Sequence, residues 1–227
     1  MITLAACGSR EAPAADSGVA TSHCVAPEGT TPAPRTIEDV VTLLNALPMP
    51  VTLPCFIETL ARPLKMHATR SLISAQPSVG PRSPRIFLFF EGLRLSIAPA
   101  GLGSRLLEFG EIRDDVRSLK AEIEFPVMAP LTPQAPFDRI LYTATATACS
   151  FCHAAEQPAE DITFTTAFTN LSLRPSAGNG VSIEALAAER AACDPAAEPD
   201  RCAMLQSLYG QGTPVEQGFP TNLATLD

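Results

Sequence analysis

The chemically richest stretch of this chain spans residues 148–154, where the letters read ACSFCHA. Cys149 and Cys152 are three residues apart, and His153 follows directly. Thiolates are nucleophiles and metal ligands, and neutral imidazole is the commonest metal ligand among side chains. Because the whole chain has 7 cysteines and 3 histidines, a chance match to this spacing has odds on the order of a few in a thousand. The stretch therefore indicates a site in which two thiols and an imidazole act together.

The spacing Cys-x-x-Cys-His resembles the haem-attachment motif of c-type cytochromes over residues 149–153. The resemblance implies a covalent haem c, with Cys149 and Cys152 as thioether anchors and His153 as the proximal iron ligand. In small cytochromes c the motif lies near the start of a compact helical domain, whereas here it ends a β-like run late in the chain. The resemblance therefore carries over these roles and single-electron transfer, but not the fold, and it implies a protein that is not an enzyme.

Two side chains are candidates for the second axial ligand of the iron. Met204 lies about fifty residues beyond the motif, and a thioether ligand raises the reduction potential of haem iron. Met204 also shares an expected helical face with Leu208, so it is equally a core residue. His67 would give a bis-histidine haem of lower potential, but it alternates with Lys65 and Thr69 on the expected solvent face of a strand. Without either ligand, a five-coordinate haem would remain open to small molecules.

Other roles for the two motif cysteines stay open. They could form a disulfide with each other, or disulfides with Cys193 and Cys202, which would leave His153 in solvent. A thiol redox pair would be expected in a strand–helix setting, and the surroundings here are β-like. Zinc would need a second cysteine–histidine pair at finger spacing, and His23 and His67 are isolated.

The N-terminus carries a second motif, Leu4-Ala5-Ala6-Cys7, that resembles the lipobox of bacterial lipoproteins. The resemblance implies a diacylated Cys7. Residues 8–35, rich in Ala, Pro, Ser, Gly and Thr, predict a flexible tether. Only three residues precede the box, so a full signal peptide would need a start further upstream. These features predict a lipid-anchored protein of the bacterial cell envelope on the periplasmic or extracellular face, and Gly8 after the cysteine favours the outer membrane.

The remaining cysteines are expected to form disulfides, because an exported chain lies in an oxidising compartment. With Cys7 lipidated and the motif cysteines on haem, Cys193 and Cys202 are close enough in sequence for a local disulfide. Cys24 and Cys55 then pair by elimination. Sequence alone leaves other connectivities open.

Charge and hydropathy limit the partners and the class of the protein. The net charge of −8 repels phosphate backbones, so we expect no nucleic-acid partner. No run of 18 apolar residues is present. With 46% hydrophobic residues in 227, the chain can bury one substantial core. The expected partners are redox proteins of the envelope, with the lipid anchor in the membrane.

The pattern along the chain predicts strands between helical ends. Thr36 and Asp39 form a helix-start signal, and Pro48 ends that helix. Ser182 and Pro199 begin two C-terminal helices. Strands are expected from residue 64 onward, with 86–90 buried, and further along the chain at 93–97, 119–125, 139–148 and 162–175. The acidic run of residues 111–115 is interpreted as a solvated turn.

The sequence thus predicts a mainly β domain over residues 36–212, with an antiparallel β-sandwich or barrel-like core, an N-terminal helix and a C-terminal helical hairpin. Residues 1–35 are the lipobox and tether, and residues 213–227 an extended tail. The predicted function is that of a monohaem c-type cytochrome-like lipoprotein. The alternative is a haem-free, disulfide-stapled β-sandwich lipoprotein that acts as a binding module.

Overall fold

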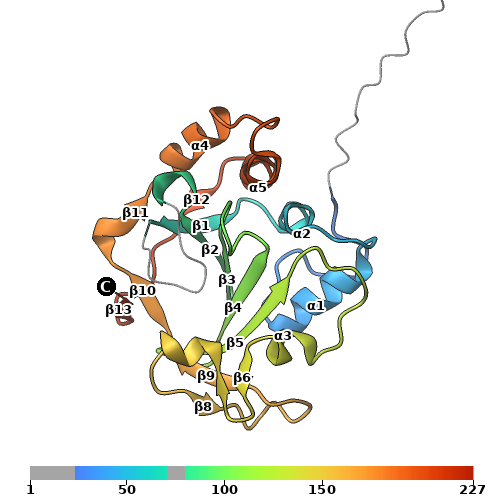
Figure 1. Cartoon of the computed structure of the whole chain (residues 1–227), viewed down its shortest axis with the longest axis vertical. Coiled ribbons are helices and arrows are strands. Elements are labelled where there is room, and N and C mark those ends of the chain that lie inside the picture. The colour runs from blue at the N-terminus through green and yellow to red at the C-terminus, as the bar shows by residue number, and fades with distance from the viewer. Residues whose placement is uncertain (1–23, 71–79, 227) are drawn as a thin grey trace, which may run out of the picture.

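The computed structural model describes residues 24–70 and 80–226. The expectations for Cys7, the lipobox and His23 concern residues outside these ranges. Within them the predicted mainly β fold is confirmed, with one large sheet and five α-helices (Figure 1). No helix of the described part is both long and apolar enough to cross a membrane.

The large sheet has nine strands in the order β11-β1-β2-β3-β4-β5-β9-β8, and β12 pairs in parallel with β1. The other neighbours are antiparallel. Among the described residues the two edges of the sheet do not pair, so it does not close into a barrel. The strands are β1 Lys65–Thr69, β2 Arg85–Phe90, β3 Leu93–Ile97, β4 Leu106–Ile112, β5 Arg117–Glu124, β8 Gln157–Pro158, β9 Phe168–Leu171, β11 Gly180–Val181 and β12 Val215–Glu216.

One face of this sheet packs against helices and forms the hydrophobic core (Figure 1). The covering helices are α1 Ile37–Ala46, α2 Leu53–Thr59 and α5 Pro199–Tyr209. In a β-sandwich a second sheet would cover this face. Here helices cover it instead. Along β2 only Ile86 and Leu88 are fully buried, so the prediction of a buried strand over residues 86–90 was wrong for Phe87, Phe89 and Phe90, which are half-buried.

The predicted start of the N-terminal helix is confirmed. Thr36 Oγ1 accepts a hydrogen bond from the Asp39 amide at 3.1 Å, and the Asp39 carboxylate accepts from the Thr36 amide in return. Helix α2 was not predicted, because seven residues are too few to show a helical period. Its start is nevertheless local, since Thr52 caps it and Pro54 stands in its first turn.

The C-terminal helical hairpin is also confirmed. Helix α4, Ile183–Ala191, is capped by Ser182, and the Tyr209 hydroxyl of α5 donates to the Ile183 carbonyl at 2.7 Å. The disulfide Cys193–Cys202 joins the ends of the two helices.

The second predicted disulfide, Cys24–Cys55, is present as well. The Cys24 amide also donates to the Glu58 carboxylate at 2.9 Å, and the Ala61 amide to the Pro32 carbonyl at 2.7 Å. The end of the predicted tether therefore lies against the domain.

Between β5 and β9 the chain departs from the predicted strands. Residues 139–148 contain a separate small hairpin of β6 Leu141–Thr143 and β7 Ala146–Thr147, preceded by α3 Ala135–Asp138. The region from residue 162 becomes a strand only at β9, and β10, Leu173–Pro175, pairs in parallel with β13, Ala224–Leu226. Residues after 212 are extended as expected, but β12 and β13 pair with the body of the domain.

Candidate functional site

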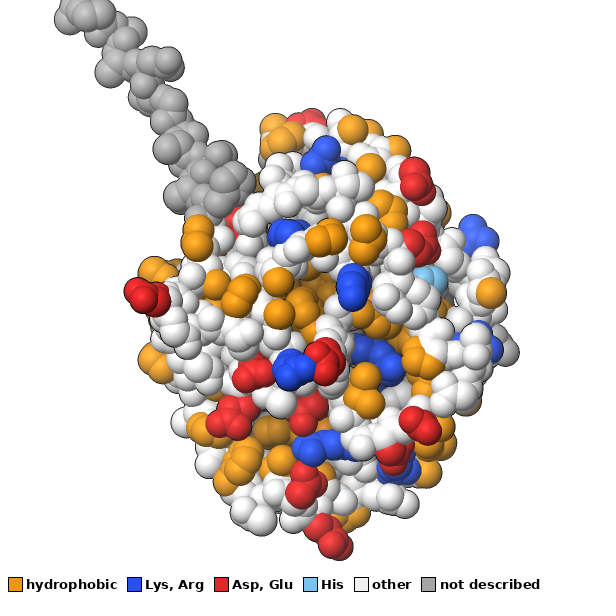
Figure 2. Space-filling view, turned by 180° about the vertical axis from the view of Figure 1, so that it is seen from behind, with side chains coloured by type: hydrophobic (Ala, Val, Ile, Leu, Met, Phe, Trp, Pro, Cys, Tyr) orange, Lys and Arg blue, Asp and Glu red, His pale blue; other side chains and the backbone are white. Residues whose placement is uncertain are grey.

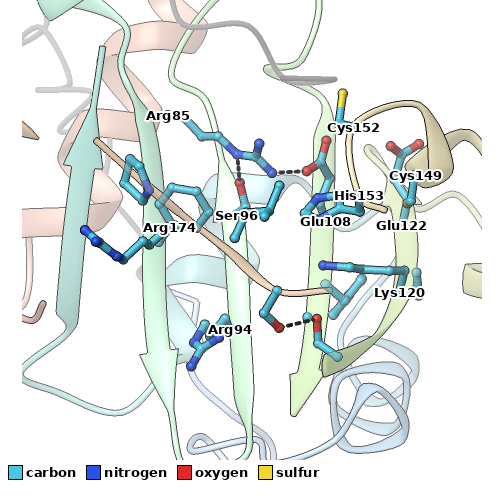
Figure 3. A pocket seen from close by; sticks show the side chains of 18 of the residues that line it. Arg85, Arg94, Ser96, Glu108, Lys120, Glu122, Cys149, Cys152, His153 and Arg174 are labelled. Carbon is cyan, nitrogen blue, oxygen red and sulfur yellow. Dashed lines mark hydrogen bonds and ion pairs between the residues drawn. The ribbon is translucent and has the colours of Figure 1, made fainter. Parts of the chain in front are cut away.

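The second face of the large sheet forms the floor of a cavity of about 140 Å³. Because side chains alternate along a strand, the residues between the core positions of β2 to β5 point to this face. Most of them are polar, and Figure 3 shows the labelled ones spread across the sheet, with the motif residues on one side and Arg85 and Arg94 on the other. Residues 172–175 and Phe219 also line the cavity. The floor consists of Arg85, Phe87, Arg94, Ser96, Glu108, Gly110, Ser118, Lys120 and Glu122.

The haem-like motif lies on a single helical turn, η2 Ala148–Phe151. Thr147 caps the turn by accepting from the Cys149 amide at 3.2 Å. The amides of Cys152 and His153 both donate to the Cys149 carbonyl, at 3.2 and 2.8 Å. A helical turn brings residues i, i+3 and i+4 to one side. All three motif side chains accordingly line the same cavity.

The His153 ring is fixed by the backbone of β9. Its Nδ1 lies 2.8 Å from the Leu171 carbonyl oxygen. A carbonyl can only accept, so Nδ1 carries the proton and Nε2 keeps a free lone pair. Burial lowers the pKa of His153 to about 3, and the positive charges of Lys120 and Arg85 act in the same direction. The ring is therefore neutral at physiological pH, which is the form that binds metals.

Cys149 and Cys152 are both free thiols, whereas the other described cysteines are paired. Disulfides from the motif to Cys193 and Cys202 are thus not formed. Burial raises the pKa of Cys149 to about 11, although the nearby Lys120 ammonium opposes the shift. Cys152 is exposed. One motif thiol is therefore sheltered and protonated, while the other is open to solvent.

The floor of the cavity holds one ion pair and one isolated amine. Arg85 pairs with Glu108, and its Nε donates to Ser96 Oγ at 2.6 Å. Lys120 is only 8% exposed. Burial lowers the pKa of Lys120 to about 8. A ligand in the cavity can bind to an amine that is buried in the cavity wall.

The two candidates for a second axial ligand lie away from the motif. Met204 is 2% exposed in the hydrophobic core, on α5, and does not line the cavity. His67 lies on β1 and was expected in solvent, but it is half-buried. Phe219 packs edge-on against its ring with 5.6 Å between centroids, and Glu216 lies 3.8 Å from its Nδ1. The returning C-terminal segment therefore covers His67 without bringing it to the motif.

The charged floor of the cavity was not predicted from the sequence. In the strand expected over residues 119–125, Lys120 alternates with Leu119 and Ala121, a pattern typical of a half-buried strand whose polar residues face solvent. Four consecutive residues of β5, from Ser118 to Ala121, are in fact buried, because both faces of the strand are covered. The segments that cover β5 are distant from it in sequence. The local sequence pattern of the strand therefore cannot predict that both of its faces are buried.

No protein-family model matches this chain, and no curated protein or solved structure shows significant similarity to it. Within residues 24–70 and 80–226, no group of three or more His, Cys, Asp or Glu side chains is arranged to hold a metal ion.

Proposed function

We propose that this chain is a monohaem c-type cytochrome-like lipoprotein of the bacterial cell envelope that transfers single electrons. One observation carries the proposal. Cys149, Cys152 and His153 all line one cavity, the two cysteines are free thiols, and the Leu171 carbonyl fixes the proton of His153 on Nδ1. This arrangement leaves two free thiols and one free imidazole nitrogen on one side of a helical turn.

The donor set fits haem c by chemistry and by protonation. Cys149 and Cys152 would hold the porphyrin through thioethers, and His153 Nε2 would ligate the iron. Haem iron supplies reversible uptake and release of one electron. The cavity of about 140 Å³ is smaller than the roughly 300–1,000 Å³ of clefts that enclose drug-sized ligands. We therefore expect the macrocycle to extend beyond the cavity, on the side where Cys152 and Phe151 are exposed.

The surroundings of His153 would tune the iron. A histidine ligand that donates its other N–H to a carbonyl is oriented and made more basic, which is the role of Leu171 here. Met204 and His67 do not line the cavity of the motif, so among the three proposed ligands only His153 would be available to hold the iron there. An exposed haem edge suits electron exchange with redox proteins of the envelope.

The two disulfides support the proposed envelope location. Disulfides persist in oxidising compartments such as the periplasm, and Cys24–Cys55 and Cys193–Cys202 are both formed. Anchoring through a diacylated Cys7, on the periplasmic or extracellular face and with the outer membrane favoured, remains part of the proposal. Figure 2 shows basic side chains interspersed with acidic ones over one face of the molecule, which does not favour a nucleic-acid partner.

The second candidate is a haem-free envelope lipoprotein that acts as a binding module. The size of the cavity favours it, because about 140 Å³ accommodates a small ligand without rearrangement. The same two disulfides would stabilise such a module.

The test is to express the full chain in a periplasm that contains haem-maturation machinery, and to record the intact mass and the reduced absorption spectrum. We expect a mass gain of one haem and sharp c-type bands. Both should disappear in the double variant Cys149→Ser/Cys152→Ser. Phe151→Ala is the matched control, because this exposed side chain lies between the two cysteines and leaves both thiols in place. A folded, colourless wild-type protein with two titratable thiols would refute the haem proposal and favour the binding module.

A further inference from the structure

Two cations flank an open gap on the cavity floor. Arg94 of β3 and Lys120 of β5 both pair across the sheet with Gly110 of β4. Paired residues in neighbouring strands point to the same face. Gly110 has no side chain, and the protein atom nearest to the place where its Cβ would lie is Ser118 Oγ, at 3.4 Å. The strand between the two cations therefore contributes no side chain of its own at this position. Figure 3 shows Lys120 extending from its strand toward the middle of the cavity.

Neither cation forms an ion pair among the residues that the structure describes. Burial lowers the pKa of Lys120, and the nearby Glu108 carboxylate acts in the opposite direction. Lys120 forms no salt bridge or hydrogen bond there, and it is 8% exposed. Arg94 is half-buried, and its guanidinium lies 5.7 Å from the centre of the Phe219 ring. A buried charge without a partner is costly. The gap above Gly110 is therefore a place where a negatively charged group would be stabilised by both cations.

The same cavity also offers a hydrogen-bond acceptor. Glu108 lies two residues before Gly110 on β4 and pairs with Arg85 through one carboxylate oxygen. Its other oxygen, Oε1, is buried and has no hydrogen-bond partner in the described part of the chain. A buried acceptor of this kind costs stability unless a donor reaches it. A ligand that filled the cavity would thus gain from carrying a donor as well as a negative charge.

We propose that this cavity binds a small carboxylate that also carries a hydroxyl or amino group. The carboxylate lies over Gly110 between Lys120 and Arg94, and the hydroxyl or amino group donates to Glu108 Oε1. The volume of about 140 Å³ is close to the roughly 150 Å³ of an engineered cavity that binds benzene. The ligand therefore has about six non-hydrogen atoms, the size of lactate. This inference does not rest on haem attachment.

The test is calorimetric titration of the full chain, expressed without haem-maturation machinery, with lactate and with propionate, which lacks the hydroxyl. We expect lactate to bind more tightly than propionate. Lys120→Met should weaken lactate binding about tenfold or more, because one charge-assisted hydrogen bond is lost. Lys65→Met is the matched control. The chain has only these two lysines, and Lys65 is exposed, so its replacement should leave lactate binding unchanged.

A second variant tests the space and leaves every charge in place. A Cβ atom built at Gly110 meets its nearest neighbour, Ser118 Oγ, at 3.4 Å, so Gly110→Ala can fold without a clash. The added methyl group should reduce lactate affinity by occupying the gap. The proposal is overturned if the wild-type protein binds neither acid, or if Lys120→Met and Gly110→Ala both bind lactate as the wild type does. Equal affinity for lactate and propionate would overturn the assigned role of Glu108. Haem attachment is read from mass and colour, so either proposal can fail alone.

Discussion

The two faces of the large sheet are built from the same strands but differ in chemistry. Toward the helices, Leu88, Leu95 and Leu107 are fully buried among apolar neighbours. Toward the cavity, Arg85 and Glu108 form an ion pair beneath a cover of backbone and Phe219. Alternation along each strand separates the two sets. It does not decide whether the polar set meets water, because this depends on the segments that cover it.

The two faces of the sheet contribute differently to the stability of the protein. Burial of apolar surface stabilises the helix-covered face. The cavity face buries Lys120 without a counter-ion among the described residues, and it holds His153 neutral in a position where protonation is unfavourable. The buried charge costs free energy of folding at neutral pH, and the depressed pKa of His153 costs it only in acid. We therefore expect substitutions on the two faces to act differently on stability.

The largest expected difference is between Leu95 and Ser96, which are adjacent in β3 and point to opposite faces. Leu95→Ala should lower the free energy of unfolding by about 2–5 kcal/mol, because it leaves a cavity in the core. Ser96→Ala removes an acceptor of Arg85 Nε and should cost about 1 kcal/mol. Urea unfolding of both variants measures the contrast. Equal losses would show that the cavity face is packed as a second core.

An intermediate effect should appear in acid through His153. Its folded pKa of about 3 lies below the unfolded value near 6.5, so the unfolded chain binds the proton first. Stability is therefore complete above pH 6.5 and falls as the pH drops toward 3, by up to about 3 kcal/mol at pH 4. In haem-free protein, His153→Gln should remove most of this loss.

His67→Gln is the control for the acid effect. This variant keeps His153, so its free energy of unfolding should still fall in acid by the amount that His153 contributes. Urea unfolding of the three proteins between pH 7 and pH 4 measures it. The same acid dependence in wild type and His153→Gln would show that another group is responsible.

The smallest effect is a gain. Lys120→Met should raise the free energy of unfolding by about 1–3 kcal/mol at pH 7, because it removes a buried, unpaired charge. The folded pKa of Lys120 is about 8, below that of a lysine in the unfolded chain. The wild type therefore gains stability as the pH rises from about 8 toward 10.5, and the advantage of the variant should shrink over that range.

Lys65→Met, at an exposed position, should change stability by less than about 0.5 kcal/mol. Thermal and urea unfolding at pH 7 and pH 9.5 test the pair of lysine variants. A loss of stability in Lys120→Met would indicate that the folded protein satisfies this amine by itself, and would weaken the case for a ligand.

Much of the secondary structure could be predicted from the sequence, because its signals are local. The Thr36 and Asp39 cap, the alternation of β3 and β5, and the Ser182 cap each depend on residues within a few positions of one another. Helix α2 and strand β4 were not predicted, since one is too short for its period and the other adjoins the acidic run that was interpreted as a turn.

For the candidate site, the sequence by itself determined that two cysteines and a histidine stand within five residues at the Cys-x-x-Cys-His spacing. That they lie on a helical turn was not predicted, because the run before them is β-like. Only the tertiary structure decided the rest. The fold places Met204 in the core, covers His67 with the C-terminal segment, and buries Lys120 beside the motif. The physical reason is that burial and charge environment depend on segments such as residues 172–175 and Phe219, which are distant in sequence from the strands that they cover.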